Sequence, residues 1–403
     1  MPCVPHRRYT RFILSTIALT LLLIGVTNLV VNPWRVLPTF LSSKSLEPWR
    51  DFPRHTRTGK AGVVLTHPDT QLAMFGSSRV AIAMRSNDPA WQGLPALNVG
   101  VPCGNIIENT TVAHYSLDRL PETDWLILNL DYGTFMSDGD SRALADFYES
   151  PFSPSPPLER NLRYLVGTST LIGSIDTLKR AAEGETSQFS PRGDWLTWHI
   201  DEPRQLLAQH LRDRKKGRDQ QYGNHPEALR EARKACFVAL LDRCLSQGIR
   251  VTLTCIPMQA LTQAWLGEDP APGPVWETER RYFASVVDAM RLKYPDQQLD
   301  WWDFSLFHPL TTEPFPPVGK HLGGTDHWID HSHPNSLLGA IMAARIAGTQ
   351  GPEHAGPPFG WHVDGSNIDA FLADLVRTEA EYRQQMPQEI EWARKVTQTS
   401  TRP

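Results

Sequence analysis

An uncharged N-terminal stretch constrains this chain more than any other feature of its sequence. The 20 residues from Phe12 to Val31 contain no charged side chain. As a helix they would be about 30 Å long, which is the thickness of the hydrocarbon core of a bilayer. A secretory signal has a shorter apolar region and a small-residue cleavage site, and the residues around Val31 offer no such site. We therefore predict an uncleaved membrane anchor over residues 12–31, and the alternative is a helix buried in a soluble core.

The charges that flank this stretch predict its orientation. Residues 1–11 contain three arginines and a histidine but no acidic side chain. Beyond the stretch, Arg35 is the nearest basic residue, and Trp34 lies where an interfacial aromatic residue is expected. Because basic flanks remain in the cytoplasm, we expect residues 1–11 to form a cytoplasmic tail and the rest of the chain to lie outside the cytoplasm.

Composition excludes several classes of protein. The 40 basic and 44 acidic residues leave a net charge of −4, which excludes a basic nucleic-acid binder and an acidic disordered chain. With 40% hydrophobic residues, the chain is long enough to bury a large core. The five cysteines are too few for a disulfide scaffold, and none forms a CxxC pair. Cys236 and Cys244 are about 12 Å apart along a predicted helix, too far for a bridge, while other pairings stay open.

Short apolar runs alternate with helical segments beyond residue 60. Five runs are expected to form buried strands: residues 71–75, 96–100, 125–130, 249–256 and 299–304. Helices are expected at residues 105–120, 226–246, 276–293 and 336–346. The first of them opens with Asn105 and Glu108, which resemble a capping box. This alternation predicts an α/β fold, with a parallel sheet covered by helices on both faces.

Three segments depart from the alternation. Residues 32–60 carry prolines and charges without sustained periodicity, which predicts a stalk or linker. Residues 137–224 are rich in Pro, Arg and Trp and show no clear strand, so we expect a largely helical insertion in a position to cover the site. Residues 351–403 carry apolar side chains at helical spacing and predict a C-terminal helical extension. One α/β domain then remains over residues 61–350, interrupted by the insertion.

Two groups of residues could carry chemistry. Residues 76–79 read Gly-Ser-Ser-Arg and follow the first strand, and ligands of open α/β sheets bind beyond the carboxyl ends of the strands. Asp330 and His333 lie together before the last helix of the predicted domain. A carboxylate can orient an imidazole, which then deprotonates a serine hydroxyl. The sequence thus predicts Ser78 as nucleophile, His333 as base and Asp330 as orienting carboxylate, with His331 as the rival base.

These segments, in this order, resemble the SGNH or GDSL-like hydrolase superfamily. They resemble more narrowly its membrane-anchored bacterial members related to polysaccharide O-acetyltransferases, such as those acting on alginate. Residues 76–78 look like the first block of the family, with Ser78 in the nucleophile position. Residues 98–100 (Asn-Val-Gly) look like the second block, whose glycine amide contributes to the oxyanion hole, and residues 330–333 look like the last. The resemblance covers roughly residues 61–350 without the insertion and implies a flavodoxin-like three-layer fold.

The third block of the family is where this sequence departs from the pattern. Members usually place Gly-x-Asn-Asp after the third strand, with the asparagine amide as an oxyanion donor, whereas residues 129–132 here read Asn-Leu-Asp-Tyr. An ionised Asp131 cannot donate a hydrogen bond. Either Asp131 is protonated, or Asn129 or another donor replaces it, or the oxyanion hole is weaker. The candidate oxyanion-hole residues are therefore Ser78, Gly100, Asn129 and Asp131.

The resemblance implies an extracytoplasmic enzyme that passes an acyl group such as acetyl to a cell-envelope polysaccharide or to water. It implies a single-pass protein of the bacterial inner membrane, with the catalytic domain in the periplasm beside a multi-pass membrane acyltransferase. We expect no cofactor, no catalytic metal and no nucleic-acid partner. Arg79 is a candidate substrate-binding residue, with a structural ion pair as its alternative.

Two other functions stay open from the sequence. One is a catalytically weak SGNH-like protein that binds polysaccharide or scaffolds its assembly machinery. The other is a metal site within residues 321–333, which hold several histidines and aspartates. The spacing of these side chains matches no standard ligand signature.

Overall fold

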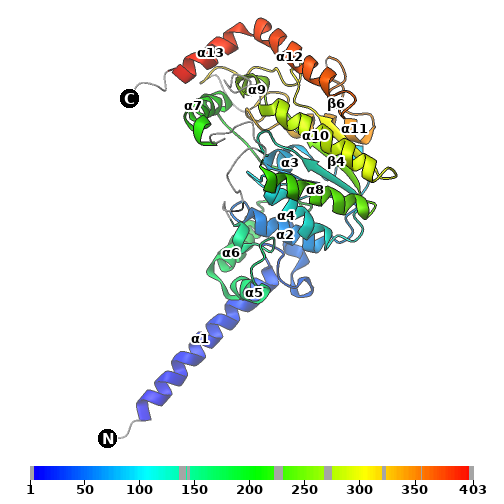
Figure 1. The fold of residues 1–403 in the computed structure, drawn as a ribbon. Coiled ribbons are helices and arrows are strands. Elements are labelled where there is room, and N and C mark those ends of the chain that lie inside the picture. Colours follow the sequence, from blue (N-terminus) through cyan, green and yellow to red (C-terminus); the bar gives the residue numbers. More distant parts are fainter. Residues whose placement is uncertain are drawn as a thin grey trace. The chain divides into compact units, whose positions relative to one another are not determined.

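The computed structural model describes residues 4–135, 142, 146–221, 230–266, 275–319, 324–354 and 356–398 (Figure 1). Its contacts divide the chain into two units. The first unit comprises Met1–Pro68 with Arg142–Pro191, and the second comprises Asp69–Ser141 with Arg192–Pro403. The segment predicted as one insertion is therefore shared between both units, and its two ends lie outside the described residues.

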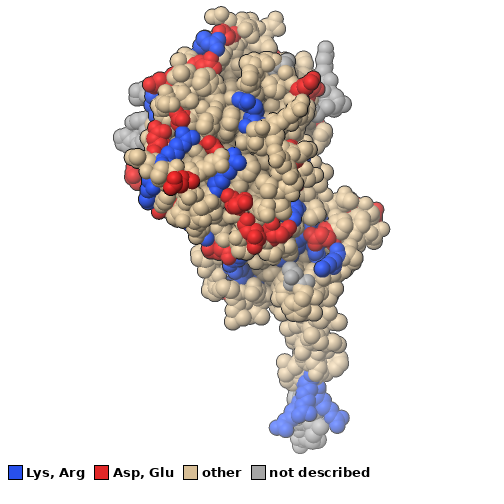
Figure 2. Space-filling model, turned by 90° about the vertical axis from the view of Figure 1, so that its right-hand side faces the viewer, with Lys and Arg blue, Asp and Glu red and all other residues tan. Residues whose placement is uncertain are grey.

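The apolar N-terminal stretch forms one long helix, α1 (Val4–Val31). The part Arg7–Val31 is long and apolar enough to cross a membrane, and most of it is exposed. In Figure 2 the basic residues at its start form one blue cluster, and the following turns show no charged side chain. The helix ends where Asn32 takes a left-handed conformation (φ 45°) ahead of Pro33, because proline cannot continue the hydrogen-bond ladder.

The remainder of the first unit consists of short helices packed around long side chains. They are η1 (Thr39–Leu41), η2 (Lys44–Trp49), α2 (Thr56–Thr66), η5 (Phe147–Glu149), α5 (Pro157–Val166) and α6 (Thr168–Glu183). Trp34 was expected at the membrane interface, but it is buried against the rings of His55 and Tyr164. The segment expected as a stalk therefore contributes to a packed unit, which includes the ion pairs that the buried Arg35 and Arg50 make with the partly exposed Glu47.

The second unit is built on one six-stranded sheet in the order β2-β1-β3-β4-β5-β6. Its strands are β1 (Leu72–Phe75), β2 (Ala96–Asn98), β3 (Trp125–Asn129), β4 (Arg250–Cys255), β5 (Leu299–Asp303) and β6 (Trp361–His362). The first five are parallel, and β6 pairs antiparallel with β5. All residues of β1, β2 and β3 are buried, as expected for strands covered on both faces. The prediction of an α/β fold with a mostly parallel sheet is confirmed.

Ten further helices of the second unit appear among the described residues. They are α3 (Ser78–Ala83), η3 (Pro89–Trp91), α4 (Ile106–Leu117), α7 (Pro203–Gln221), α8 (Glu231–Ser246), α9 (Ala260–Leu266), α10 (Val275–Lys293), α11 (Ser336–Ala347), α12 (Ile368–Gln385) and α13 (Pro387–Gln398). The helices α4, α8 and α10 lie side by side over the sheet, and α11 packs against α3 (Figure 1).

Local sequence signals explain several helix boundaries. As predicted, the Asn105 side chain caps α4, where its Oδ1 accepts the Ile107 and Glu108 amides at 3.1 and 3.2 Å. The helix predicted from residue 226 begins at Glu231, and residues 226–229 lie outside the described part of the chain. The expected C-terminal extension forms α12 and α13.

Candidate active site

The first predicted block forms a tight strand-to-helix turn. Ser78 is the first residue of α3 and comes three residues after the end of β1, across a turn that Gly76 and Ser77 make. A Cβ on Gly76 would lie 2.5 Å from the Val80 side chain and 2.8 Å from Asn129, so only glycine fits there. The turn therefore presents Ser78 at the carboxyl end of a central strand, where open α/β sheets bind ligands.

The fold brings the three predicted catalytic residues together. Ser78 Oγ lies 2.8 Å from His333 Nε2, across 255 residues of sequence. His333 Nδ1 lies 2.7 Å from Asp330 Oδ2. With its proton on Nδ1, the imidazole donates to Asp330 and can accept the Ser78 proton on Nε2. This is the arrangement that activates a serine nucleophile.

The Asp330 carboxyl is held as an anion. It is 1% exposed, and this burial opposes ionisation. Hydrogen bonding and the charge of His333, with a smaller effect of His331, outweigh the burial and hold the pKa of Asp330 well below its usual range. The amides of Ser332 and His333 also donate to its Oδ1, at 2.8 and 3.0 Å. Asp330 can therefore orient the imidazole across the neutral pH range.

The rival base, His331, points elsewhere. Its ring stands 4.3 Å from the ring of His210, measured between centroids. Its Nδ1 is 4.0 Å from Asp330 Oδ1, whereas His333 is the histidine hydrogen-bonded to Ser78. The geometry thus favours His333 over His331, as the order of residues in the last block predicted.

Trp198 is a neighbour of this site that sequence reasoning missed. Its Nε1 donates to Asp330 Oδ2 at 3.4 Å, and its ring lies 5.3 Å from the His333 ring. Trp195 supports it in an edge-on contact at 4.7 Å. The available signal was a pair of tryptophans in a segment expected to cover the site. Trp198 contacts both the orienting carboxylate and the base, so it can fix the position of the imidazole.

Two of the candidate oxyanion donors are already engaged. The Gly100 amide donates to Asn98 Oδ1 at 3.0 Å. Asn129 Nδ2 donates to Asp131 Oδ1 at 2.8 Å. For the Ser78 amide, by contrast, the described residues provide no acceptor outside its own helix. The Ser78 N–H is therefore the candidate donor that is available without rearrangement.

Arg79 and Asp131 form an ion pair beside the nucleophile. Arg79 Nη1 lies 3.0 Å from Asp131 Oδ1, and both side chains are largely buried. Asp131 accepts from Arg79 and from Asn129, so it does not act as an oxyanion donor in this arrangement. Of the two roles considered for Arg79, the structure displays the ion pair.

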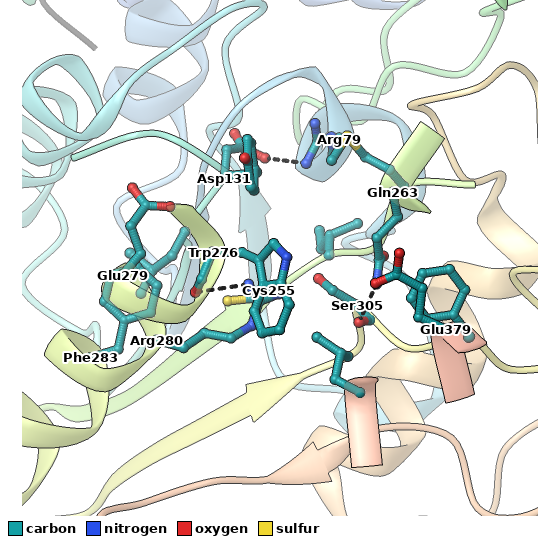
Figure 3. Close-up of a pocket in the computed structure, with 16 residues that line it drawn as sticks. Arg79, Asp131, Cys255, Gln263, Trp276, Glu279, Arg280, Phe283, Ser305 and Glu379 are labelled. Carbon is teal, nitrogen blue, oxygen red and sulfur yellow. Dashed lines mark hydrogen bonds and ion pairs between the residues drawn. The ribbon is translucent and has the colours of Figure 1, made fainter. Parts of the chain in front are cut away.

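The Arg79–Asp131 pair borders a pocket at the carboxyl ends of β3 and β4 (Figure 3). Gln263, Trp276 and Glu279 also line it. Burial raises the pKa of the Glu279 carboxyl to about 7, although the amides of Phe135 and Gly133 donate to it and oppose this effect. The pocket therefore combines aromatic surface with polar groups, as small-molecule sites commonly do.

The metal alternative finds no support within the described part of the chain. There, no group of three or more His, Cys, Asp or Glu side chains is placed to hold a metal ion. His327 instead hydrogen-bonds Glu313. His321, which belongs to the predicted cluster, lies outside the described residues.

No protein-family model, no curated protein and no solved structure matches this chain. Its function must therefore be inferred from the residues that the fold brings together. Those residues form a serine, histidine and aspartate relay, and Arg79, which follows the serine in sequence, lines a pocket. Such a relay is suited to nucleophilic attack on an acyl carbon.

Proposed function

We propose that this chain is a membrane-anchored serine acyltransferase or esterase of the SGNH-like type. The observation that carries the proposal is the relay from Ser78 Oγ through His333 to Asp330. Ser78 attacks the carbonyl carbon of an acyl donor while His333 accepts the hydroxyl proton. His333 then returns the proton to the leaving group, and an acyl-enzyme remains. A sugar hydroxyl or a water, deprotonated by His333, takes the acyl group and regenerates the serine.

The sheet supports an SGNH-like, flavodoxin-like three-layer fold. The order 2-1-3-4-5 of the five parallel strands is the order of flavodoxin-like doubly wound sheets. In that order the direction of winding changes between β1 and β3. Ser78 follows β1 and Asp131 follows β3, so the candidate site occupies the switch point where such folds bind ligands.

The proposed location follows from α1 and its basic start. The helix crosses the bacterial inner membrane once, and residues 1–11 stay in the cytoplasm. The catalytic unit then works in the periplasm on a cell-envelope polysaccharide. A multi-pass membrane acyltransferase supplies the acyl group there.

A second candidate function rests on the oxyanion donors. The Gly100 and Asn129 donors are engaged within the protein, and the loss of one oxyanion donor typically costs about 2.7 to 4 kcal/mol of transition-state stabilisation. This observation favours a catalytically weak SGNH-like protein that binds polysaccharide or scaffolds its assembly machinery.

An acyl-transfer assay separates the two functions. The full chain in detergent is incubated with p-nitrophenyl acetate, and both nitrophenol release and intact mass are followed. Ser78→Ala and His333→Ala test the relay, and Ser246→Ala, an exposed serine at the end of α8, is the matched control. Activity or acetyl gain in the wild type and the Ser246→Ala control, but not in Ser78→Ala, supports the enzyme. Equal behaviour of all four proteins rejects it on simple esters and favours the binding function.

A further inference from the structure

Large apolar side chains are exposed on the short helices that contact the end of α1. Phe40 is 83% exposed, Leu158 74% and Ile172 57%. Three others are 44–54% exposed and lie on the same helices: Leu162, Ile175 and Leu178. We call these six residues the apolar collar. Single exposed apolar residues are ordinary, but a group gathered on one part of a protein marks a contact surface.

Two helices of the collar, α5 and α6, contact α1 near its C-terminal end. Asn28 Nδ2 donates to the Leu165 carbonyl at the end of α5, at 3.0 Å, and its Oδ1 accepts from Ser174 Oγ of α6, at 3.0 Å. A Cβ on Gly25 would lie 3.6 Å from the Leu165 side chain. At 1.5 Å per residue, Asn28 and Gly25 are about 5 and 9 Å inside the end of the apolar helix at Val31. The helices α5 and α6 therefore contact α1 within its membrane-spanning length.

The third segment of the collar attaches closer to the end of α1. The Ser43 amide donates to the Val30 carbonyl at 2.9 Å, and this bond holds the preceding η1 turn with Phe40 beside the end of α1. Val26 and Val30 of α1 are themselves 52% and 43% exposed. The apolar surface of the anchor thus continues onto its neighbours.

The helices of the collar are amphipathic. Leu158 and Leu162 are four residues apart on α5, and Ile172 and Ile175 are three apart on α6, so each pair shares one face. Arg163, one residue further around α5 from Leu162, is on the polar side of that helix and is 69% exposed. Helices of this kind lie in the plane of a membrane, with the apolar face about 5 to 10 Å inside the boundary between headgroups and acyl chains. That depth agrees with the level at which α5 and α6 meet α1.

We propose that α5, α6 and the η1 turn lie in the membrane–water interface on the non-cytoplasmic side of the membrane that α1 crosses. The apolar collar is then in contact with lipid. The inference rests on the proposed membrane insertion of α1 and does not depend on catalysis. Lipid is the occupant that the structure favours because the collar residues come from three segments, all attached within the last two turns of the anchor. A protein partner would be expected to use a single groove or face.

Spin labels on the full chain test this inference. The protein, with its native cysteines replaced by serine, is reconstituted in vesicles of phosphatidylcholine and phosphatidylglycerol. Labels are attached at Leu162→Cys and Ile175→Cys, at Arg163→Cys as the matched control, and at Leu19→Cys within the anchor. Collision rates with oxygen, which concentrates in lipid, and with a water-soluble nickel chelate are then compared.

The expected result is a ratio of oxygen to nickel collisions at 162 and 175 that is roughly threefold or more above the ratio at 163. A water-like ratio at 162 and 175 with a lipid-like ratio at 19 overturns the collar inference alone. A water-like ratio at 19 as well refutes the membrane anchor. Protection of 162 and 175 from both reagents means that a second copy of the chain covers the collar, which also overturns contact with lipid.

Discussion

Among the described residues, both units bury charged side chains, but the strands with buried apolar runs lie in the second unit. The second unit is organised around strands such as β1, whose four residues are apolar and fully buried. The first unit buries Arg35, Arg57 and Lys60, each at most 2% exposed, and leaves the apolar collar outside. A buried apolar run leaves a periodic pattern in the sequence, whereas a buried network of charges does not. This difference explains why the strands and helices of the second unit could be predicted from the sequence, whereas most of the packing of the first unit could not.

The largest expected effect is in the second unit. Ser78→Ala should lower the proposed acyl transfer on the order of 10³-fold or more, because the relay then has no nucleophile. The free energy of unfolding should change little, since the lost hydroxyl makes one hydrogen bond, to His333. Ester turnover and a urea unfolding curve measure the two quantities. A variant that retains wild-type turnover would remove Ser78 from the mechanism.

The stability of the second unit should depend on pH through Glu279. Its folded pKa is raised to about 7 by burial, so between pH 4.5 and 7 the folded chain keeps a proton that the unfolded chain has released. The free energy of unfolding should therefore fall by about 3 kcal/mol as the pH rises through this window. Glu279→Gln cannot titrate and should flatten the dependence. Urea unfolding at several pH values checks this, and parallel slopes for both proteins would contradict it.

A charge deletion should destabilise the first unit selectively. Glu47→Ala leaves the buried Arg35 and Arg50 without their shared carboxylate. We expect a loss of about 2 to 3 kcal/mol, less than for a fully buried pair because the Glu47 side chain is 32% exposed. Hydrogen exchange should accelerate in α2 but not in β1.

An exposed ion pair provides the control for that experiment. Glu159→Ala removes the partner of Arg163, and both of these side chains are more than 60% exposed. It should have little effect on exchange in either unit. Equal acceleration in both units by Glu47→Ala would show that the two units unfold together.

The smallest expected effect concerns Trp198. Trp198→Phe keeps an aromatic ring beside His333 but removes the Nε1 donor to Asp330. Because that bond is long, we expect kcat to fall only about two- to tenfold, with KM unchanged. The pH profile of kcat should shift, since the Asp330–His333 pair loses a donor. A change in KM alone would assign Trp198 to substrate binding instead.

The five parallel strands of the second unit could be predicted from the sequence, with small errors at the strand ends. Each of the five predicted strands is present, with bounds within two residues of those expected. The strand β6 was missed because it has two residues and no apolar run. The burial of Trp34 was missed because the rings of His55 and Tyr164 that cover it come from segments without a periodic pattern.

In the candidate site, too, some features could be predicted from the sequence and others could not. The chain order of Ser78, Asp330 and His333 was visible in the sequence, and so was the departure at Asp131. The engagement of Asn129 with Asp131 was not visible, because a hydrogen bond depends on side-chain direction and leaves no trace in composition or spacing.

The sequence by itself determined the long apolar helix, the alternation of strands and helices, and the residue types available for catalysis. These features follow from hydrophobic periodicity and local capping, which act over a few residues. The tertiary structure decided which of those residues meet. It brought Ser78 within 2.8 Å of His333 across 255 residues, added Trp198 and paired Arg79 with Asp131. Such contacts arise when parallel strands align their carboxyl ends in one sheet, and only the folded chain creates that alignment.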